Sequence, residues 1–247
     1  MTVPFGPLTL YMARICPFAQ RITIALHELG LLSSISEGKQ ASGALEVVEI
    51  DLQNKPDYYL RDVNPRGKVP ALRITHSEGS GNKKDEVLAE SALIAELLLQ
   101  ANRHPAALMR PEDALRRFRG GLIVDTLGNQ FIGPFFKLLG EKDTSKHAEL
   151  RTKLLDGIKA VQAVLQPVDE GAFALGTKEP TLPDILSASF LVRIVVNEHW
   201  RDFKVPRTEE YARFNAWFDA LKARESVRAT TISAEELVEG YRGFALG

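Results

Sequence analysis

Cysteine is nearly absent from this sequence, because Cys16 carries the one thiol among 247 residues. A single cysteine excludes an internal disulfide and any mechanism that uses two thiols of the same chain. It favours a reducing, cytoplasmic location, since chains made for oxidising compartments usually carry paired cysteines. Residues 1–7 also lack the basic patch and apolar run of a secretory signal, which supports the same expectation.

Excess charge and long apolar runs are missing as well. The formal net charge is −1, so no long-range field favours nucleic acid, an anionic membrane surface or another polyanion as a partner. No apolar run approaches the ~18 residues of a membrane-spanning helix. The composition, 45% hydrophobic and 26% charged, is typical of a globular protein with a sizeable core, in one large domain or two ordinary ones.

The first hundred residues alternate between strand-like and helix-like patterns. Residues 8–12 form a short apolar run that predicts a strand. Apolar residues spaced by three or four predict a helix over residues 15–29, with Gly30 as its stop. After a Ser- and Gly-rich loop at 33–44, the β-branched run 45–50 predicts a second strand.

A second group of elements completes this domain. Residues 55–63 suit a short, irregular helix, and residues 69–75 and 86–88 predict two strands joined by a hairpin loop at 76–85. A strong helical pattern covers residues 90–102. The order predicts a small mixed sheet between helices, whose first two strands are parallel because a helix crosses over between them.

The remainder of the sequence is helical. Residues 104–111 carry two prolines and form the predicted linker between a domain of residues 1–103 and a domain of residues 112–247. Thr181 and Asp184 have the spacing of a capping box at a helix start. The sequence therefore predicts an α/β domain followed by an all-helical one.

Cys16 follows a predicted strand and precedes a predicted helix, with Pro17 at the first helical position. A thiol there faces unpaired backbone N–H groups and the positive end of the helix dipole, which should lower its pKa below the free value of ~8.5. A lone cysteine is otherwise more often a small buried hydrophobe. A C-x-x-C motif would carry its second cysteine at Ala19, so any mixed disulfide on Cys16 must be resolved by an external thiol.

Val69 and Pro70 open a strand that is predicted to face the Cys16 loop. A cis peptide bond between them would turn the Val69 backbone N–H and C=O outward, ready to pair with an extended peptide. An ordinary trans proline at the first residue of a strand is the commoner alternative.

Four polar residues have the chemistry to hold the charged ends of such a peptide. Ser91 and the nearby helix-start amides suit a carboxylate, and Glu90 suits an ammonium, although a plain N-cap is the more frequent explanation of this pair. Lys55 and Lys68 suit another carboxylate, although surface lysines are usually only solvated. Together with Cys16, these parts predict a receptor for a small zwitterionic thiol peptide.

At these positions the sequence resembles the cytosolic glutathione transferases, most closely the omega class and its fungal omega-like relatives. The resemblance implies a thioredoxin-like first domain, an all-helical second domain and a homodimer. The match is specific from about residue 8 to residue 102 and weaker beyond. It rests on Cys16-Pro17-Phe18-Ala19-Gln20-Arg21, Asn54-Lys55-Pro56, Asn64-Pro65-Arg66-Gly67-Lys68-Val69-Pro70, Glu90-Ser91 and the capping box from Thr181 to Asp184.

The resemblance also implies roles for the residues of the thiol site. Cys16 would be the catalytic thiol. Lys55 would pair with the glycyl carboxylate of glutathione, and Val69 would make a backbone contact beside a cis Pro70. No metal site is implied.

For the rest of the tripeptide, the resemblance implies that Glu90 and Ser91 hold the γ-glutamyl end. Phe18 would pack beside the bound tripeptide, and Lys68 lies where related classes often use a polar contact. The loops at 33–44 and 76–85 are longer than the compact family pattern.

The implied activity is that of a glutathione-dependent thiol transferase or dehydroascorbate reductase, with glutathione as co-substrate and Cys16 forming a mixed disulfide with it. Two alternatives share the fold. A chloride intracellular channel-like protein would need a long apolar first helix, which Arg21, His27 and Glu28 interrupt. A non-catalytic ligand carrier is the other.

The acceptor side of such a site is predicted in the helical stretch at 112–139. Glycines beside Phe131 and Phe135 suggest open volume lined by aromatic rings, suited to hydrophobic or aromatic glutathionyl adducts, with Trp200 closing the far wall. The alternative is that the six apolar residues of this stretch are all core or dimer contacts: Leu115, Phe118, Leu122, Leu127, Phe131 and Phe135. No motif explains the segment 226–247. Three further apolar residues suit a core face: Leu115, Phe118 and Leu122.

Overall fold

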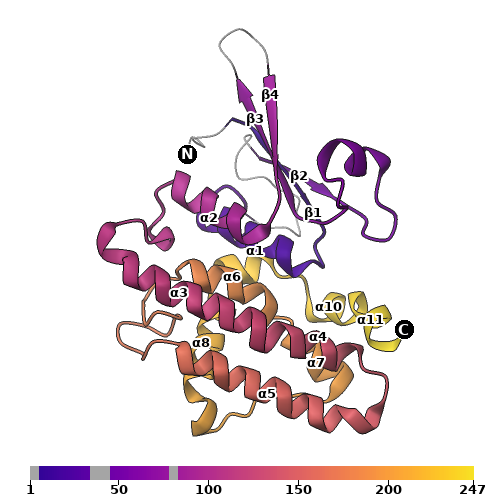
Figure 1. The fold of residues 1–247 in the computed structure, drawn as a ribbon, viewed down its shortest axis with the longest axis vertical. Helices are drawn as coiled ribbons and strands as arrows, with labels where there is room; N and C mark the ends of the chain where they lie inside the picture. Colours follow the sequence, from indigo (N-terminus) through magenta and orange to yellow (C-terminus); the bar gives the residue numbers. More distant parts are fainter. Residues whose placement is uncertain (1–5, 34–44, 78–82) are drawn as a thin grey trace. The chain divides into compact units, whose positions relative to one another are not determined.

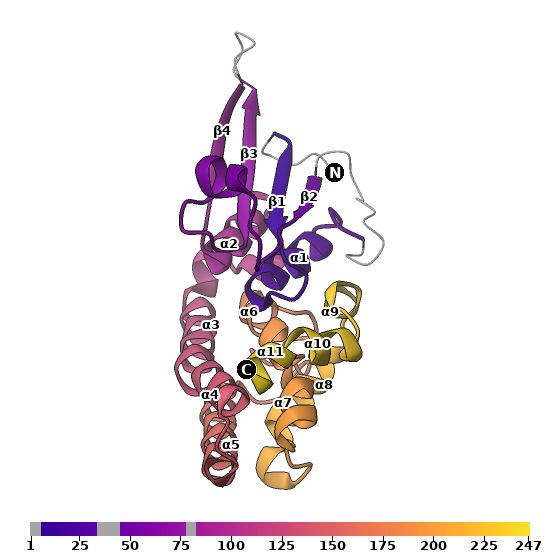
Figure 2. The same ribbon diagram turned by 90° about the vertical axis from the view of Figure 1, so that its right-hand side faces the viewer.

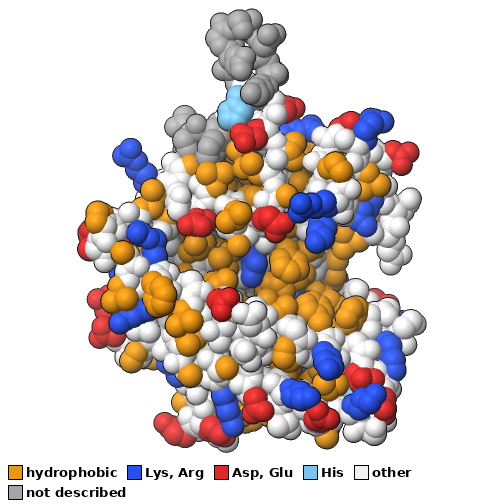
Figure 3. Space-filling model, in the orientation of Figure 1, with side chains coloured by type: hydrophobic (Ala, Val, Ile, Leu, Met, Phe, Trp, Pro, Cys, Tyr) orange, Lys and Arg blue, Asp and Glu red, His pale blue; other side chains and the backbone are white. Residues whose placement is uncertain are grey.

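The structure is a computed structural model that describes residues 6–33, 45–77 and 83–247 (Figure 1). All of the predicted loop at 33–44 except its first residue lies outside the described residues. Among the described residues, no helix combines the length and the apolar character needed to cross a membrane. On the face drawn in Figure 3, acidic and basic side chains are interspersed, in keeping with the small net charge.

The chain divides into two compact units. Unit 1 comprises Met1–Ala107 and Glu225–Thr231, and unit 2 comprises Leu108–Arg224 and Ile232–Gly247. This division departs from the predicted helical domain at 112–247, because a short segment near the C-terminus belongs to unit 1. Helical periodicity shows that a segment has an apolar face, but it does not show which unit that face packs against.

Unit 1 is built on a four-stranded sheet with the strand order β2-β1-β3-β4. β1 (Leu8–Met12) pairs in parallel with β2 (Leu45–Glu49), as expected for two strands joined by the crossover helix α1 (Pro17–Glu28). β3 (Ala71–Ser77) is antiparallel to both β1 and β4 (Lys83–Leu88). This topology, followed by a helical unit, confirms the predicted thioredoxin-like domain and all-helical domain.

The two faces of the sheet are buried by different elements. On one face, Tyr11 of β1 packs with both ends of the irregular helix η1 (Tyr59–Val63). The neighbouring residue Leu10 points to the opposite face and is also fully buried. There α1 and α2 (Ser91–Ala101) contact each other and contribute apolar side chains to a second core layer.

The β3–β4 hairpin has longer strands than predicted, and residues 78–82 of the predicted loop lie outside the described residues. Strand pairing continues to Ser77 and Lys83, so the loop predicted at 76–85 is wrong at both ends. Polar cross-strand contacts support this extension, for example the Thr75 hydroxyl that donates to the Asp85 carboxylate at 2.9 Å. β4 is an edge strand, and an exposed edge needs no apolar alternation to form.

Unit 2 is helical throughout its regular structure. A π-helical turn, η4 (Leu127–Ile132), joins α3 (Ala114–Thr126) to α4 (Gly133–Gly140). Helical structure is therefore continuous through most of the stretch predicted at 112–139. The longer elements of unit 2 are α3 (Ala114–Thr126), η4 (Leu127–Ile132), α4 (Gly133–Gly140), α5 (His147–Val164), α6 (Leu182–Leu191), α7 (Ile194–Arg201), α8 (Ala212–Ala223), α10 (Ala234–Gly240) and α11 (Arg242–Leu246).

The face of α3 that was predicted to lie in the core is exposed. Phe118 is 67% exposed, and hydrophobic side chains gather over α3 in Figure 3. The buried face instead carries Gly120 and Ile123, and a Cβ on Gly120 would come within 3.2 Å of Pro183. An apolar stripe alone did not distinguish a core face from a surface face. The prediction was therefore wrong for Leu115, Phe118 and Leu122.

The predicted capping box begins α6. The Asp184 carboxylate is fully buried and accepts hydrogen bonds from the backbone N–H of Thr181 at 2.8 Å and from its hydroxyl at 2.8 Å. It also accepts from the backbone N–H of Ala174 at 2.8 Å and from the indole N–H of Trp217 at 2.7 Å. Burial raises the pKa of the Asp184 carboxyl, and these hydrogen bonds oppose that shift. One carboxylate thereby joins a helix start, a loop and α8.

We predict that Asp184→Asn lowers the free energy of unfolding by roughly 2–4 kcal/mol, because an amide nitrogen would face buried donors that then lack an acceptor. Asp219→Asn is the matched control, since Asp219 forms an exposed pair with Arg207 at 2.6 Å and should cost less than about 1 kcal/mol. Urea denaturation followed by tryptophan fluorescence measures both. Equal losses in the two variants would contradict this account of α6.

Candidate functional site

A cavity of about 480 Å³ in unit 1 brings together every residue predicted to bind glutathione. These residues come from the start of α1, the segment before β3 and the start of α2. The predicted lining residues are Cys16, Phe18, Lys55, Lys68, Val69, Pro70, Glu90 and Ser91. Leu52, Asn64, Arg66, Gly67 and Ala89 also line the cavity.

Cys16 occupies the N-cap position of α1, directly before Pro17 at the first helical position. Its carbonyl accepts the first hydrogen bond of the helix, from the N–H of Gln20 at 3.1 Å, and its own N–H donates to Ala13 at 2.9 Å. The Sγ atom is half-buried and lies 3.8 Å from the carbonyl oxygen of Val69. The thiol therefore sits at a helix start, where the positive end of the helix dipole favours a negative sulfur.

Arg21 places a buried positive charge one turn further along α1. Its side chain is only 7% exposed, and burial lowers the pKa of the guanidinium to about 10, which leaves it charged at neutral pH. The Cys16 sulfur opposes this lowering of the Arg21 pKa, as an attraction between thiolate and guanidinium requires. The Val69 carbonyl has the opposite effect on Cys16. It accepts a hydrogen bond from the S–H group, which favours the neutral thiol over the thiolate.

Hydrogen bonds to one carbonyl shape the segment before β3. The Asn64 side-chain amide donates to the carbonyl of Lys68 at 2.8 Å, and the Tyr59 hydroxyl donates to the same oxygen at 2.6 Å. Burial raises the pKa of Tyr59 to about 12, so the hydroxyl stays protonated and keeps donating. Asn64 also accepts from the N–H of Arg66 at 3.1 Å, which completes a tight turn.

Gly67 closes the turn before β3, beside the side chains of Leu60 and Lys55. Its φ of +64° is in the left-handed region, and an added Cβ would come within 3.2 Å of the Leu60 side chain. The Lys55 ammonium donates to the carbonyl of Leu52 at 2.8 Å, and two of its three hydrogens remain for a ligand. The Val69–Pro70 peptide bond is cis, and the Val69 N–H has no acceptor among the residues that the structure describes.

Glu90 and Ser91 meet at the start of α2. Glu90 precedes the helix with a φ of +73°, a conformation that non-glycine residues rarely adopt and that concentrates at functional sites. Its exposed carboxylate lies 3.8 Å from the guanidinium of Arg66. Ser91 is the first helical residue and not the N-cap, so the predicted capping role was wrong. Its buried hydroxyl instead accepts from Arg21 at 3.5 Å.

Positive groups outnumber negative ones around this cavity. Lys55, Arg66 and Lys68 line it, whereas Glu90 is the acidic residue among the described lining. Such a site suits a ligand with more carboxylates than ammonium groups, since each carboxylate finds a cation and the ammonium finds one carboxylate.

Three residues that shape the site had no predicted role. Arg21 and Asn64 stand inside the motifs that carried the family resemblance, but sequence alone does not show that their side chains turn inward. Tyr59 gave no signal, because its role depends on a contact with Lys68 that only the folded chain creates.

The residues predicted to line an acceptor pocket lie in unit 2 and pack internally. Phe131 is 0% exposed and Phe135 is 1% exposed, and their ring centroids lie 5.8 Å apart. The half-buried Trp200 donates its indole N–H to the carbonyl of Val238 in α10 at 3.1 Å. The structure therefore assigns the two phenylalanines to the core. Gly128 and Gly133 lie on the exposed side of the same helical stretch, where an added Cβ would meet nothing within 4 Å, so the open space beside them is not a pocket lined by these rings.

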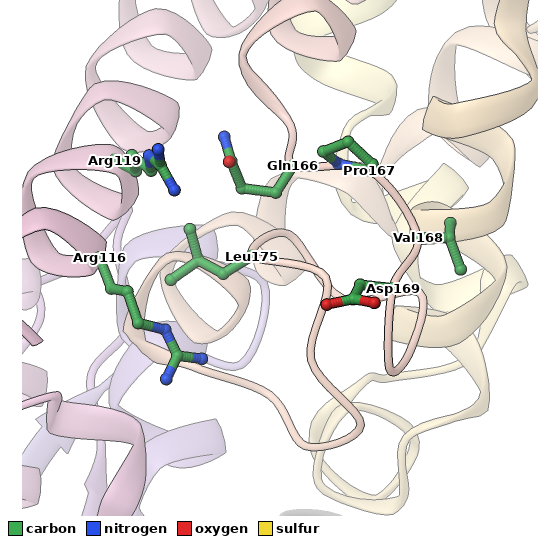
Figure 4. Close-up of a pocket in the computed structure, with 7 residues that line it drawn as sticks. All are labelled: Arg116, Arg119, Gln166, Pro167, Val168, Asp169 and Leu175. Carbon is green, nitrogen blue, oxygen red and sulfur yellow. The ribbon is translucent and has the colours of Figure 1, made fainter.

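A second cavity, of about 400 Å³, lies in unit 2 between α3 and the loop that follows α5. Figure 4 shows Arg119 of α3 and Gln166 of the loop pointing toward each other, with Leu175 beside them. Its described lining contains no thiol, so this cavity offers no group for thiol chemistry. The lining comprises Arg116, Arg119, Gln166, Pro167, Val168, Asp169 and Leu175.

Comparison with known proteins matches the thiol site to one family. A model of the glutathione S-transferase N-terminal domain matches residues 15–101. Glutathione S-transferase L3 of Arabidopsis thaliana is 30% identical over 96% of this chain and 87% of its own length. A probable glutathione transferase omega-2 of Caenorhabditis elegans is 27% identical over 98% of this chain and 87% of its own length.

A solved structure of a glutathione transferase supports the same family assignment. Glutathione transferase Omega 2C of Trametes versicolor is 30% identical, covers 97% of this chain and 99% of its own, and superposes with a TM-score of 0.71. Sequence similarity over nearly the whole chain and the similarity of the fold agree with one another. The chain belongs to the glutathione transferase family and is an omega-like member of it.

Proposed function

We propose that this chain is a glutathione-dependent thiol transferase that works through a mixed disulfide between Cys16 and glutathione. The observation that carries the proposal is the position of the sole cysteine at the N-terminus of α1, on the wall of a cavity whose charged side chains match those of the tripeptide. Family membership supports glutathione as the co-substrate. A reducing cytoplasm would supply that glutathione, which supports a cytoplasmic location.

The charges of glutathione match the cavity in pairs. The glycyl carboxylate would accept from the Lys55 ammonium, whose side chain is held over Gly67. The γ-glutamyl ammonium would donate to Glu90, and the γ-glutamyl carboxylate would accept from Ser91 and from the free amides at the start of α2. Each contact joins a charged ligand group to a partner of opposite charge or to a hydrogen-bond donor.

The middle of the tripeptide would pair with Val69 in the manner of an added strand. The backbone N–H of Val69 has no acceptor among the described residues, and the Val69 carbonyl lies 3.8 Å from the Cys16 sulfur. A peptide held by this residue would bring its own sulfur close to Cys16. Phe18, which is 42% exposed on the cavity wall, would pack beside it, and Lys68 would offer a polar contact.

Two thiol–disulfide exchanges complete the reaction. The Cys16 thiolate attacks the glutathionyl sulfur of a mixed disulfide substrate, so a Cys16–glutathione bond forms, the substrate S–S bond breaks and the substrate leaves as a thiolate that takes up a proton. The thiolate of a second glutathione then attacks the glutathionyl sulfur on Cys16. Glutathione disulfide is released, and Cys16 returns as a thiolate.

A homodimer is proposed through the exposed apolar face of α3. Leu115, Phe118 and Leu122 recur every three or four residues and are 58%, 67% and 41% exposed. A contiguous apolar stripe of this kind marks an interaction surface more often than a solvated one. A second copy of the same chain would cover it, as the family resemblance implies.

We predict that Cys16→Ser abolishes thiol transfer from a glutathionyl disulfide while leaving the affinity for glutathione within about twofold, because the holders of the tripeptide remain. A coupled assay of glutathione disulfide formation, with calorimetry for binding, measures both. Wild-type turnover in Cys16→Ser would disprove the mechanism. Wild-type protein that binds glutathione without turning over would favour the non-catalytic ligand carrier.

Glu90→Ala and Ser91→Ala should each raise the Kd for glutathione roughly tenfold or more, since hydrogen bonds to charged groups contribute about 1.5–3 kcal/mol. Glu96→Ala on the same helix is the control, because Glu96 is not part of the cavity lining and binds Gln100 at 2.8 Å. Titration calorimetry is the measurement. The assignment fails if the two site variants bind as tightly as the control.

Phe118→Glu should convert the dimer to a monomer, because it places a charge in the middle of the apolar stripe. Val168→Glu is the control, since Val168 is similarly exposed, at 56%, but lies on a loop outside α3. Light scattering coupled to gel filtration gives the mass of each. A monomeric wild type, or dimers in both variants, would rule out this interface.

A further inference from the structure

α9 (Glu225–Thr230) is a short helix late in the chain, drawn in yellow in Figure 2, and it belongs to the same unit as the thiol site. It contacts α1, the helix that presents Cys16. Ser226, Val227 and Thr230 are 1%, 3% and 1% exposed, so this small element is fully packed on one side. The sequence offered no motif to explain it.

Two side-chain hydrogen bonds join this segment to opposite ends of α1. The Gln20 amide, in the first turn of α1, donates to the hydroxyl of Thr231, the residue after α9, at 2.8 Å. At the other end of α1, the Ser226 hydroxyl donates to the Glu28 carboxylate at 2.5 Å. The later residue of the segment thus meets the earlier residue of α1, so the two elements run in opposite directions.

The Thr231 hydroxyl is oriented for this contact. It donates to the carbonyl of Val227 within its own segment at 2.6 Å, which directs its lone pairs toward other donors. The Gln20 amide fills one of those positions. The contact between α1 and this segment therefore has a defined geometry, with the donor on α1 and the acceptor on Thr231.

Gln20 is also the residue that closes the first turn behind the thiol. Its backbone N–H donates to the carbonyl of Cys16 at 3.1 Å, and the next residue along is the buried Arg21. We infer that the Gln20–Thr231 hydrogen bond is a positioning contact of the thiol site, which holds the first turn of α1 so that Cys16 stays at the N-cap position, one turn before the buried Arg21. The Ser226–Glu28 bond stabilises the far end of α1 and has no such effect.

The inference rests on Cys16 as the reactive group of the proposed function, but its test needs no glutathione. The test is the rate of Cys16 alkylation by iodoacetamide against pH, in the full chain, which reports on the one thiol present. In Thr231→Val the alkylation midpoint should rise by about half a pH unit, and the rate at a pH well below the midpoint should fall about threefold. Thr231→Ser should restore both values.

Ser226→Ala is the matched control, because it also removes one hydroxyl from the segment but acts at the far end of α1. Its alkylation midpoint should equal that of wild type, even where its thermal unfolding midpoint falls as much as that of Thr231→Val. Gln20→Met deletes the same contact from the α1 side and serves if Thr231→Val does not fold.

A wild-type alkylation midpoint in Thr231→Val or Gln20→Met would overturn the inference, as would an equal shift in Ser226→Ala. If Thr231→Val shows the alkylation shift but the wild-type protein does not turn over glutathione, the result would count against the proposed function and not against this inference.

Discussion

The proposed function depends on one interaction, the attraction between a Cys16 thiolate at the start of α1 and the positive end of that helix. Cys16 takes the N-cap position, and Pro17 leaves one fewer amide hydrogen without a partner. The buried Arg21 adds a full charge behind the first turn. In this proposal the other residues that line the cavity position the ligand against the sulfur, and none of them would perform thiol chemistry without the thiolate.

The residues proposed to hold that ligand come from three separate parts of unit 1, and local features of the backbone fix them. Gly67 adopts a left-handed φ of +64°, and an added Cβ would come within 3.2 Å of the Leu60 side chain. Glu90 keeps a φ of +73°, a strained conformation that packing must maintain. Tyr59 and Asn64 converge on the carbonyl of Lys68 and set the turn between them. Lining residues that are fixed in this way reduce the cost of binding a ligand.

Sequence reasoning predicted the thioredoxin-like topology, and the residues that it proposed for the thiol site line one cavity. Both depend on short-range patterns: strand and helix periods, the Cys-Pro helix start, and motifs in fixed order. It failed where the burial of a side chain depends on which distant part of the chain packs against it. Phe118 and Phe131 both look like core residues on one helical path, yet one is 67% exposed and the other 0% exposed. The packing of α9 on α1 joins Gln20 to Thr231 across most of the chain, and no local pattern encodes that contact.

The central claim, that Cys16 carries glutathione during turnover, is tested most directly by acid-quenching the working enzyme and weighing the intact chain. The account predicts a fraction of chains heavier by one glutathione, with the added mass mapped to Cys16, that disappears on addition of glutathione at least as fast as the enzyme turns over. Turnover without any such adduct, or an adduct that discharges more slowly than kcat, would contradict it.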